Sequence, residues 1–103
     1  ALCLGAKGAV GSSYNFAANI YHQIIVAFER GDFEKAREHQ FQSVQVIRIL
    51  AAAGYMAAAR EVMQILGAAV GDARLPNARL DDAAKTKLHS DLDDCGFFDW
   101  IRE

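Results

Sequence analysis

Apolar residues recur at helical spacing between positions 15 and 30. Phe16, Ile20, Ile24 and Phe28 follow one another at four-residue steps, and polar residues fall between them. Steps of three or four residues place side chains on one face of an α-helix. The pattern therefore predicts a helix of about four turns over residues 15–30.

A second helix is expected immediately afterwards. Gly31 stands where a left-handed C-terminal cap is favoured, and Asp32 stands where a helix N-cap is favoured. The apolar residues that follow predict a helix from Phe33 to about Ala53, which Gly54 ends. So short a link predicts an antiparallel hairpin.

The third predicted helix runs from Tyr55 to Leu66. It is apolar on nearly every side, so we expect it to be the most buried helix. Residues 67–80 then form a connection, because turn-forming residues gather there.

A fourth helix is expected after the connection. Either Asp81 or Asp82 supplies its N-cap, and Gly96 ends it. We expect Phe97 to fold back onto Leu92 in a Schellman-type contact.

The first fourteen residues have a different character. They are small and rich in glycine, which disfavours a helix, and they predict a turn plus a short strand at Ala9-Val10. A strand this short needs partners that the rest of the chain does not offer.

Together these elements predict an all-α fold for the isolated chain, with four helices. The length of 103 residues allows one compact unit over 1–103. Its expected parts are a loop or strand segment at 1–14, three helices at 15–66, the connection at 67–80, and a C-terminal helix and tail at 81–103.

The charge and composition of the chain argue against some classes of partner. The net charge of -2 comes with scattered basic residues, so nucleic acid is not an expected partner. Arg30, Arg48 and Arg60 interrupt the apolar runs, so no membrane span is expected. The start of the chain does not resemble a signal peptide, and Cys3 and Cys95 are expected to be reduced thiols of a cytoplasmic protein.

The sequence offers no complete catalytic site, and we predict no metal site and no cofactor. The three histidines lack metal-ligand spacing, and the acidic cluster of the fourth helix lacks the pattern of a calcium loop. No lysine lies in an apolar setting that would favour a Schiff base, and no histidine and carboxylate can be assigned to a serine or cysteine nucleophile. The residues weighed are His22, His39, His89, Asp91, Asp93, Asp94, Lys7, Lys35, Lys85, Lys87, Ser12, Ser13 and Cys95.

One motif remains, Gly-Ala-Val-Gly-Ser-Ser-Tyr-Asn at residues 8–15. Here a short strand turns through small residues into a helix, where glycine lets a ligand approach the backbone and free amides attract oxygen atoms. An ordinary glycine turn with a Ser or Asn helix cap would have the same sequence features.

The same motif resembles the Gly-Ala-Val-Gly-Ser-Thr-Tyr-Asn stretch of N-acetylneuraminate lyases, in the dihydrodipicolinate synthase superfamily. Residues 27–36, Ala-Phe-Glu-Arg-Gly-Asp-Phe-Glu-Lys-Ala, are similar to the helical hairpin of that family, and Arg74-Leu75-Pro76 is similar to an element before its last helix. The resemblance is collinear over essentially the whole chain.

The resemblance implies a place in a larger fold, a (β/α)8 TIM barrel followed by three helices. The chain would correspond to the last strand, the last barrel helix and the three C-terminal helices. The family cleaves sialic acid to pyruvate and N-acetylmannosamine through a Schiff base on a lysine of strand six, assisted by a tyrosine of strand five. Both strands would precede Ala1. Gly11 and Ser12 match the family's substrate-binding Gly-Ser, whereas Ser13 replaces its threonine.

Two hypotheses follow. In the first, the chain is the C-terminal portion of a sialic acid lyase, inactive alone, which binds sialic acid and pyruvate when the barrel is completed. In the second, it is a non-enzymatic helical oligomerisation or interaction module derived from that family. In either case we expect a homo-oligomer, a two-fold dimer that pairs the apolar stripes of residues 15–30, with residues 5–13 disordered or recruited into the helix or the interface.

Overall fold

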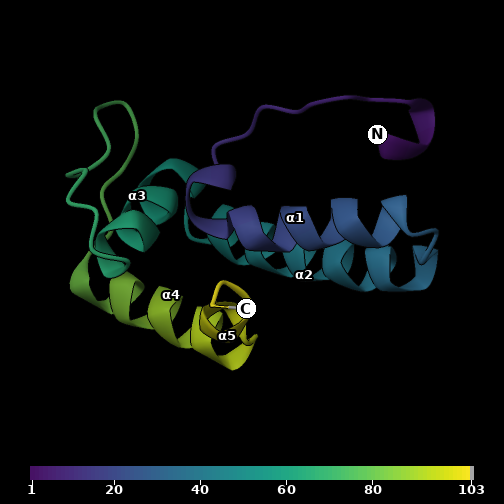
Figure 1. Cartoon of the computed structure of the whole chain (residues 1–103). Helices are drawn as coiled ribbons and strands as arrows, with labels where there is room; N and C mark the ends of the chain where they lie inside the picture. The colour runs from purple at the N-terminus through teal and green to yellow at the C-terminus, as the bar shows by residue number, and fades with distance from the viewer. Residues whose placement is uncertain (103) are drawn as a thin grey trace.

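The computed structural model describes residues 1–102 and is all-helical over that range (Figure 1). Its elements are a 3₁₀ turn η1 (Leu2–Leu4) and the helices α1 (Tyr14–Glu29), α2 (Phe33–Ala52), α3 (Tyr55–Ile65), α4 (Asp82–Asp94) and α5 (Phe97–Trp100). Glu103, the last residue of the expected tail, lies outside the described residues. None of the described helices combines the length and the hydropathy needed to span a membrane.

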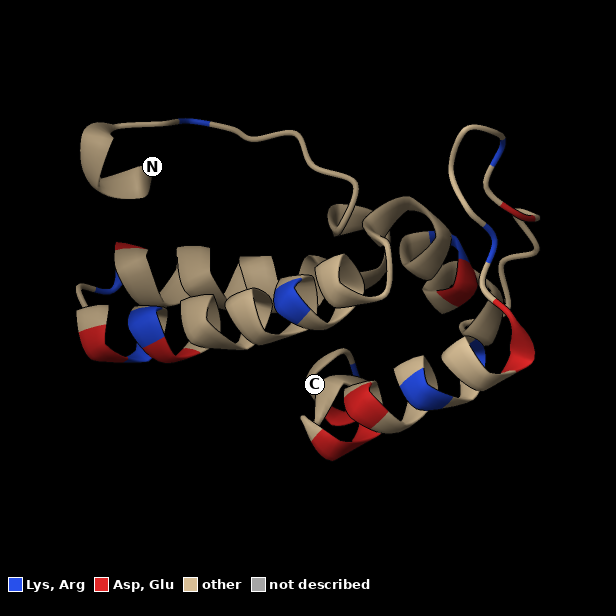
Figure 2. Ribbon diagram, turned by 180° about the vertical axis from the view of Figure 1, so that it is seen from behind, with Lys and Arg blue, Asp and Glu red and all other residues tan. Residues whose placement is uncertain are grey.

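The hairpin of α1 and α2 forms as its capping residues predict. Gly31 has a φ of 76°, and the Asp32 carboxylate accepts a hydrogen bond of 3.0 Å from the backbone N–H of Lys35. These caps end α1 and start α2 within three residues, which returns the chain antiparallel to itself. The two helices lie side by side in both ribbon views (Figures 1 and 2).

The C-terminal part contains one more helix than expected. Asp81 caps α4 by accepting a hydrogen bond of 2.7 Å from the N–H of Ala84. Gly96, with a φ of 89°, ends α4, as predicted, and the chain then forms the short helix α5. Phe97 and Leu92 lie in the same buried cluster, so the tail is anchored to the core.

One apolar cluster joins all five α-helices. It contains Phe16, Ala17, Ile20, Val46, Leu50, Ala58, Val62, Leu88, Leu92 and Phe97. Within residues 1–102, no buried side-chain nitrogen or oxygen lacks a hydrogen-bond partner. The core therefore contains no unsatisfied polar side chain that would cost folding free energy.

The strand expected at Ala9-Val10 is absent from the described residues. Residues 6–11 form an extended arm instead, and Val10 is fully exposed. The arm runs apart from α1, on the side of α1 opposite α2 (Figures 1 and 2). A strand needs a neighbour for its backbone hydrogen bonds, and this helical chain provides none.

Helix α3 is mostly covered, as its apolar composition predicted. Ala58 and Val62 are fully buried, but Met56 and Gln64 are exposed and the other residues of α3 are half-buried. The exposed share of α3 is thus the smallest among the described helices, in line with its apolar composition, and α3 lies at one end of the hairpin (Figure 1).

Half of the apolar stripe of α1 is buried within the chain, whereas we expected the whole stripe to be exposed. Phe16 and Ile20 are buried inside this chain, whereas Ile24 and Phe28 are half-buried. A folded single copy therefore leaves much less of this stripe exposed than we expected, because α2 and α5 cover its first half.

Cys95 is a free thiol at the end of α4. Its Sγ donates to the carbonyl of Leu92, 3.2 Å away. Burial raises the pKa of the Cys95 thiol, and the negative charges of Asp91 and Asp94 raise it further, against an opposing effect of backbone hydrogen bonds.

Replacing Leu50 by alanine tests the core. Leu50 is fully buried, so Leu50→Ala is expected to lower the free energy of unfolding by about 2–5 kcal/mol, measured by urea denaturation. Leu75→Ala is the matched control, because the Leu75 side chain is 90% exposed and should change stability by less than about 0.5 kcal/mol. Equal effects of the two substitutions would contradict the assigned core.

The Cys95 thiol makes stability depend on pH at the alkaline end. Because its pKa is raised in the folded state, its contribution is fully present below the unfolded-state value of 9.0 and is lost as pH rises through the folded-state pKa. Urea denaturation from pH 8 upward should therefore show a steeper loss of stability for the native chain than for Cys95→Ala. Cys3→Ala, at an exposed thiol, should behave like the native chain.

Candidate functional site

The two residues predicted to bind substrate lie in the turn that leads into α1. Ser12 is exposed, and its Oγ is 2.7 Å from the hydroxyl of Tyr55, the first residue of α3. The side-chain amide of Asn15 donates a hydrogen bond of 2.9 Å to the Ser12 carbonyl. Ser12 is thus held on its backbone side by α1 and on its side-chain side by α3.

Ser13, the next residue, connects this turn to the middle of α1. Ser13 is buried, and its Oγ lies 2.7 Å from the hydroxyl of Tyr21, two turns further along α1. The rings of Tyr14 and Tyr21 meet edge to face, with centroids 4.4 Å apart. These contacts span a local kink at Ala17, whose φ of -125° and ψ of 26° are not helical. The start of α1 is therefore a separate turn tied to the helix by tyrosine.

Gly11 faces a different side from the Ser12 hydroxyl. A Cβ at position 11 would lie 3.4 Å from the Tyr14 ring, so a larger side chain would press against that ring. Gly11 lines an open hollow of about 330 Å³ between the start of α1 and the middle of α2. The residues around this hollow are Gly11, Ser13, Tyr14, Tyr21, Gln40, Ser43, Val44, Ile47 and Arg48. Gly11 lines this hollow, whereas Ser12 does not, so the two predicted binding residues do not share a cavity.

The histidines do not join this site. His39 Nδ1 is 2.9 Å from the Gln42 side-chain oxygen, the His89 ring lies against Phe98 with centroids 5.1 Å apart, and His22 is exposed. Across residues 1–102, no group of three His, Cys, Asp or Glu side chains is placed to hold a metal ion.

The lysines also do not join this site. Lys7 is in the exposed arm. The other three form ion pairs with nitrogen–oxygen distances of 2.7, 3.2 and 2.6 Å: Lys35 with Glu38, Lys85 with Glu61, and Lys87 with Asp91. A lysine that forms a Schiff base needs a dry pocket that favours its neutral amine, and a carboxylate partner favours the ammonium instead.

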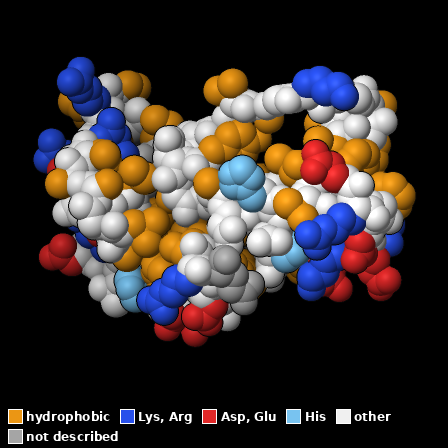
Figure 3. All heavy atoms as spheres, viewed as in Figure 1, with side chains coloured by type: hydrophobic (Ala, Val, Ile, Leu, Met, Phe, Trp, Pro, Cys, Tyr) orange, Lys and Arg blue, Asp and Glu red, His pale blue; other side chains and the backbone are white. Residues whose placement is uncertain are grey.

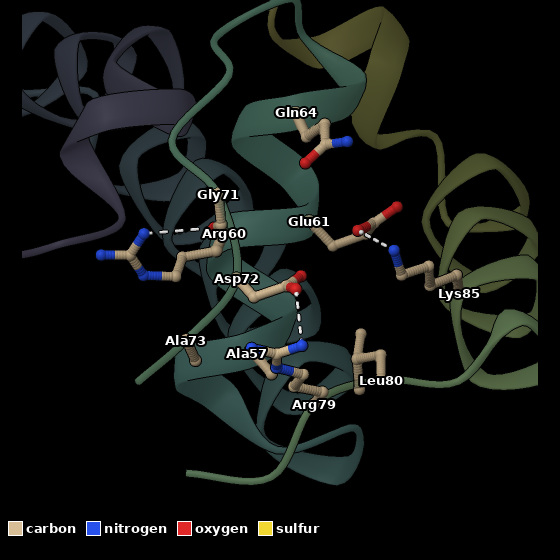
Figure 4. Close-up of a pocket in the computed structure, with 10 residues that line it drawn as sticks. All are labelled: Ala57, Arg60, Glu61, Gln64, Gly71, Asp72, Ala73, Arg79, Leu80 and Lys85. Atoms are coloured by element: carbon tan, nitrogen blue, oxygen red, sulfur yellow. Dashed lines mark hydrogen bonds and ion pairs between the residues drawn. The ribbon is translucent and has the colours of Figure 1, made fainter. Parts of the chain in front are cut away.

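A second, much smaller cavity lies between α3, the connection and α4 (Figure 4). The Arg60 guanidinium donates to the carbonyls of Val70 and Gly71, and Arg79 pairs with Asp72 at 3.6 Å. The cavity measures about 10 Å³, at the lower limit for one water molecule. Its side chains hold the connection against α3, and they leave no room for a substrate.

Two tyrosines of the site were missed by sequence reasoning. Ser13 and Tyr21 are only eight residues apart, but the non-helical residue Ala17 lies between them, so regular helical spacing does not predict their contact. Ser12 and Tyr55 are 43 residues apart, and no local pattern connects them.

Comparison with known proteins places this geometry in a family. Residues 1–95 match the model of the dihydrodipicolinate synthetase family. The N-acetylneuraminate lyase of Sus scrofa is 38% identical over 105 aligned residues, which cover 96% of this chain and 33% of the relative.

Solved structures agree with the sequence matches. Proteus mirabilis N-acetylneuraminate lyase and the N-acetylneuraminate lyase (sialic acid aldolase) of Aliivibrio salmonicida superpose with a TM-score of 0.87 each, at 33% and 34% identity. Each alignment covers 93% of this chain and 32% of the solved chain. The chain spans about a third of the length of these relatives and corresponds to the C-terminal part of their TIM-barrel fold. The chain belongs to the dihydrodipicolinate synthetase family.

Proposed function

We propose that the Gly11-Ser12 turn contributes to the sugar-binding wall of an N-acetylneuraminate lyase-type aldolase. Such an enzyme cleaves sialic acid by a retro-aldol reaction into pyruvate and N-acetylmannosamine. The observation that carries the proposal is the solvent-facing pair of hydroxyls of Ser12 and Tyr55, 2.7 Å apart.

The chemistry of this pair suits a polyhydroxylated ligand. A hydroxyl both donates and accepts, so Ser12 and Tyr55 can exchange their mutual hydrogen bond for bonds to sugar hydroxyls without stranding a charge. Both groups are held on helices, because Ser12 precedes α1 and Tyr55 starts α3. Gly11 and Ser12 would bind and orient the sugar acid, and neither would take part in bond cleavage.

In this proposal the 103 residues do not catalyse the cleavage by themselves. Retro-aldol cleavage through a Schiff base needs a neutral lysine amine next to the substrate carbonyl. The lysines of this chain are exposed or paired with carboxylates. The reaction would therefore depend on barrel strands that bring a lysine and a tyrosine to the Ser12 turn. A cytoplasmic location belongs to the same proposal, since Cys3 and Cys95 are free thiols.

A non-enzymatic role as a helical interaction module is the second candidate. It is favoured by the large apolar side chains that remain exposed on both hairpin helices. Hydrophobic side chains also reach the surface along the hairpin beneath the arm (Figure 3). The two candidates differ in their ligand, which is a sugar acid in the first and a protein surface in the second.

Incubation of the chain with pyruvate or N-acetylneuraminate and borohydride tests the absence of a reactive lysine. We expect no covalent adduct, because none of the lysines lies in a dry pocket. Intact-mass spectrometry measures the result, and a full-length sialic acid lyase is the positive control. A stoichiometric adduct on Lys7, Lys35, Lys85 or Lys87 would refute the proposed inactivity.

A chimera tests the role of Ser12 in substrate binding. Residues 1–103 would replace the corresponding C-terminal third of Proteus mirabilis N-acetylneuraminate lyase, and the chimera is expected to cleave N-acetylneuraminate. Ser12→Ala should lower kcat/KM by about 2- to 10-fold, the effect of losing one net hydrogen bond of about 0.5–1.5 kcal/mol.

The control for the chimera is Ser90→Ala on α4, whose hydroxyl is exposed and makes one long contact of 3.5 Å to Asp94. It should leave kcat/KM unchanged. An unchanged kcat/KM for Ser12→Ala in an active chimera would remove Ser12 from the proposed binding wall.

A further inference from the structure

Ser13 does not use its hydroxyl as the first residue of a helix normally does. It is the N-cap of α1, yet no backbone N–H of the first turn donates to its side chain. Asp32 and Asp81 are the N-caps of α2 and α4, and both carboxylates accept such a hydrogen bond. The Ser13 Oγ instead lies 2.7 Å from the hydroxyl of Tyr21. An N-cap hydrogen bond stabilises the start of a helix, and in α1 the contact with Tyr21 takes its place.

Tyr21 lies beyond the kink that separates the first turn of α1 from the rest of the helix. The kink is at Ala17, whose φ and ψ are not helical, and Tyr21 follows it by four residues. Helical φ and ψ at every residue keep successive turns of a helix on one axis. A non-helical residue leaves the direction of the first turn open, so contacts across the kink are needed to fix it.

Tyr21 contacts the first turn at two places. Its hydroxyl meets the Ser13 Oγ, and its ring meets the Tyr14 ring edge to face. Because Ser13 is buried, its hydroxyl has little access to water as an alternative partner. The hydrogen bond and the ring contact together hold the turn against the body of α1.

Ser12 depends on this turn for its position. Its carbonyl accepts hydrogen bonds from the backbone N–H of Asn15, at 3.2 Å, and from the Asn15 side chain, at 2.9 Å. Both bonds lie on the N-terminal side of the kink at Ala17. The turn therefore orients Ser12, and Tyr21 orients the turn.

We propose that Tyr21 is a positioning residue of the sugar-binding wall, which acts on the ligand through the Ser13 hydroxyl and the Ser12 turn. This inference rests on the proposed function of Ser12. In that function a sugar replaces the bond between the Ser12 and Tyr55 hydroxyls, so α3 no longer holds the Ser12 side chain once the ligand is bound. The bond between Ser13 and Tyr21 persists in the bound state, since neither hydroxyl has to contact the ligand. A side chain that is already held in its binding geometry loses less conformational entropy on binding.

Urea denaturation of the intact chain tests the contact without a ligand. Tyr21→Phe keeps the ring but leaves the buried Ser13 hydroxyl without its partner, so it should lower the urea midpoint. Tyr14→Phe is the matched control, because the Tyr14 hydroxyl forms no hydrogen bond within residues 1–102 and its ring is retained. Equal midpoints for the two variants would overturn the proposal.

Kinetics of the chimera with Proteus mirabilis N-acetylneuraminate lyase test the positioning role. Tyr21→Phe should raise KM for N-acetylneuraminate by about 2- to 10-fold and keep kcat within about 2-fold, because it weakens binding and leaves the bond-cleaving residues unchanged. A merely structural defect would lower the amount of active enzyme, which reduces the apparent kcat and leaves KM unchanged. Tyr14→Phe should keep the native KM.

Ser13 variants test the link between Tyr21 and the turn. Ser13→Ala should raise KM about as much as Tyr21→Phe does, because either substitution removes the same hydrogen bond. Ser13→Thr should keep the native KM, since threonine, which the lyase motif has at this position, retains the Oγ. A native KM for Ser13→Ala would contradict the proposed link.

A double variant tests whether Tyr21 acts through Ser12. In a chimera that carries Ser12→Ala, adding Tyr21→Phe should change KM by less than about 2-fold, because the group that Tyr21 positions is already gone. Effects that multiply would show independent roles and overturn the proposal. If Ser12→Ala itself changes nothing in an active chimera, the proposed function fails. If Ser12→Ala weakens the chimera but Tyr21→Phe does not, only the role of Tyr21 fails.

Discussion

The contact between the two ends of the chain holds this fold together. Phe16 near the start of α1 and Phe97 at the start of α5 meet edge to face, with ring centroids 6.5 Å apart. Beside them, the Asn19 side chain donates a hydrogen bond of 2.9 Å to the carbonyl of Trp100, across 81 residues. Joining segments so far apart costs loop-closure entropy, which the burial of the rings offsets. This closure packs α5 against the start of α1.

The candidate site depends on the same closure. Phe16 and Ala17 are buried, and they fix the turn that carries Ser12 and the kink that follows it. The hydroxyl pairs Ser13–Tyr21 and Ser12–Tyr55 then bind that turn to α1 and to α3. The exposed Ser12 is therefore held by one hydrogen bond at its hydroxyl and one at its carbonyl, which suits a group that orients a ligand and performs no chemistry on it.

The two faces of α2 have separate tasks. One face packs Val46 and Leu50 into the core, and the other presents Phe41 to solvent. The arm and α1 form a third surface, where Val10 has no neighbour. The hairpin thus uses one face of α2 for the core and leaves the other face of α2 and the arm at the surface.

The sequence by itself determined the features that depend on near neighbours. Gly31 and Asp32 set the hairpin because caps act over three or four residues, and the apolar periods located the four main helices. The motif at residues 8–15, with the runs at 27–36 and 74–76, was enough to indicate the family, and substrate binding by Gly11 and Ser12 stays a prediction. Their local setting, a turn entering a helix, was also correct.

Only the tertiary structure decided the features that depend on distant segments. Ala9-Val10 has the sequence of a strand but forms none here, because a strand requires a partner for its hydrogen bonds. Helix α5 forms because Phe97 reaches a core made by other helices. Tyr55 joins Ser12 through the packing of α3 beside the start of α1, and Phe41 stays exposed because α2 turns its opposite face, with Val46 and Leu50, toward the core. These features depend on contacts between helices that are far apart in the sequence. The spacing of apolar residues along the chain does not specify which helices come into contact.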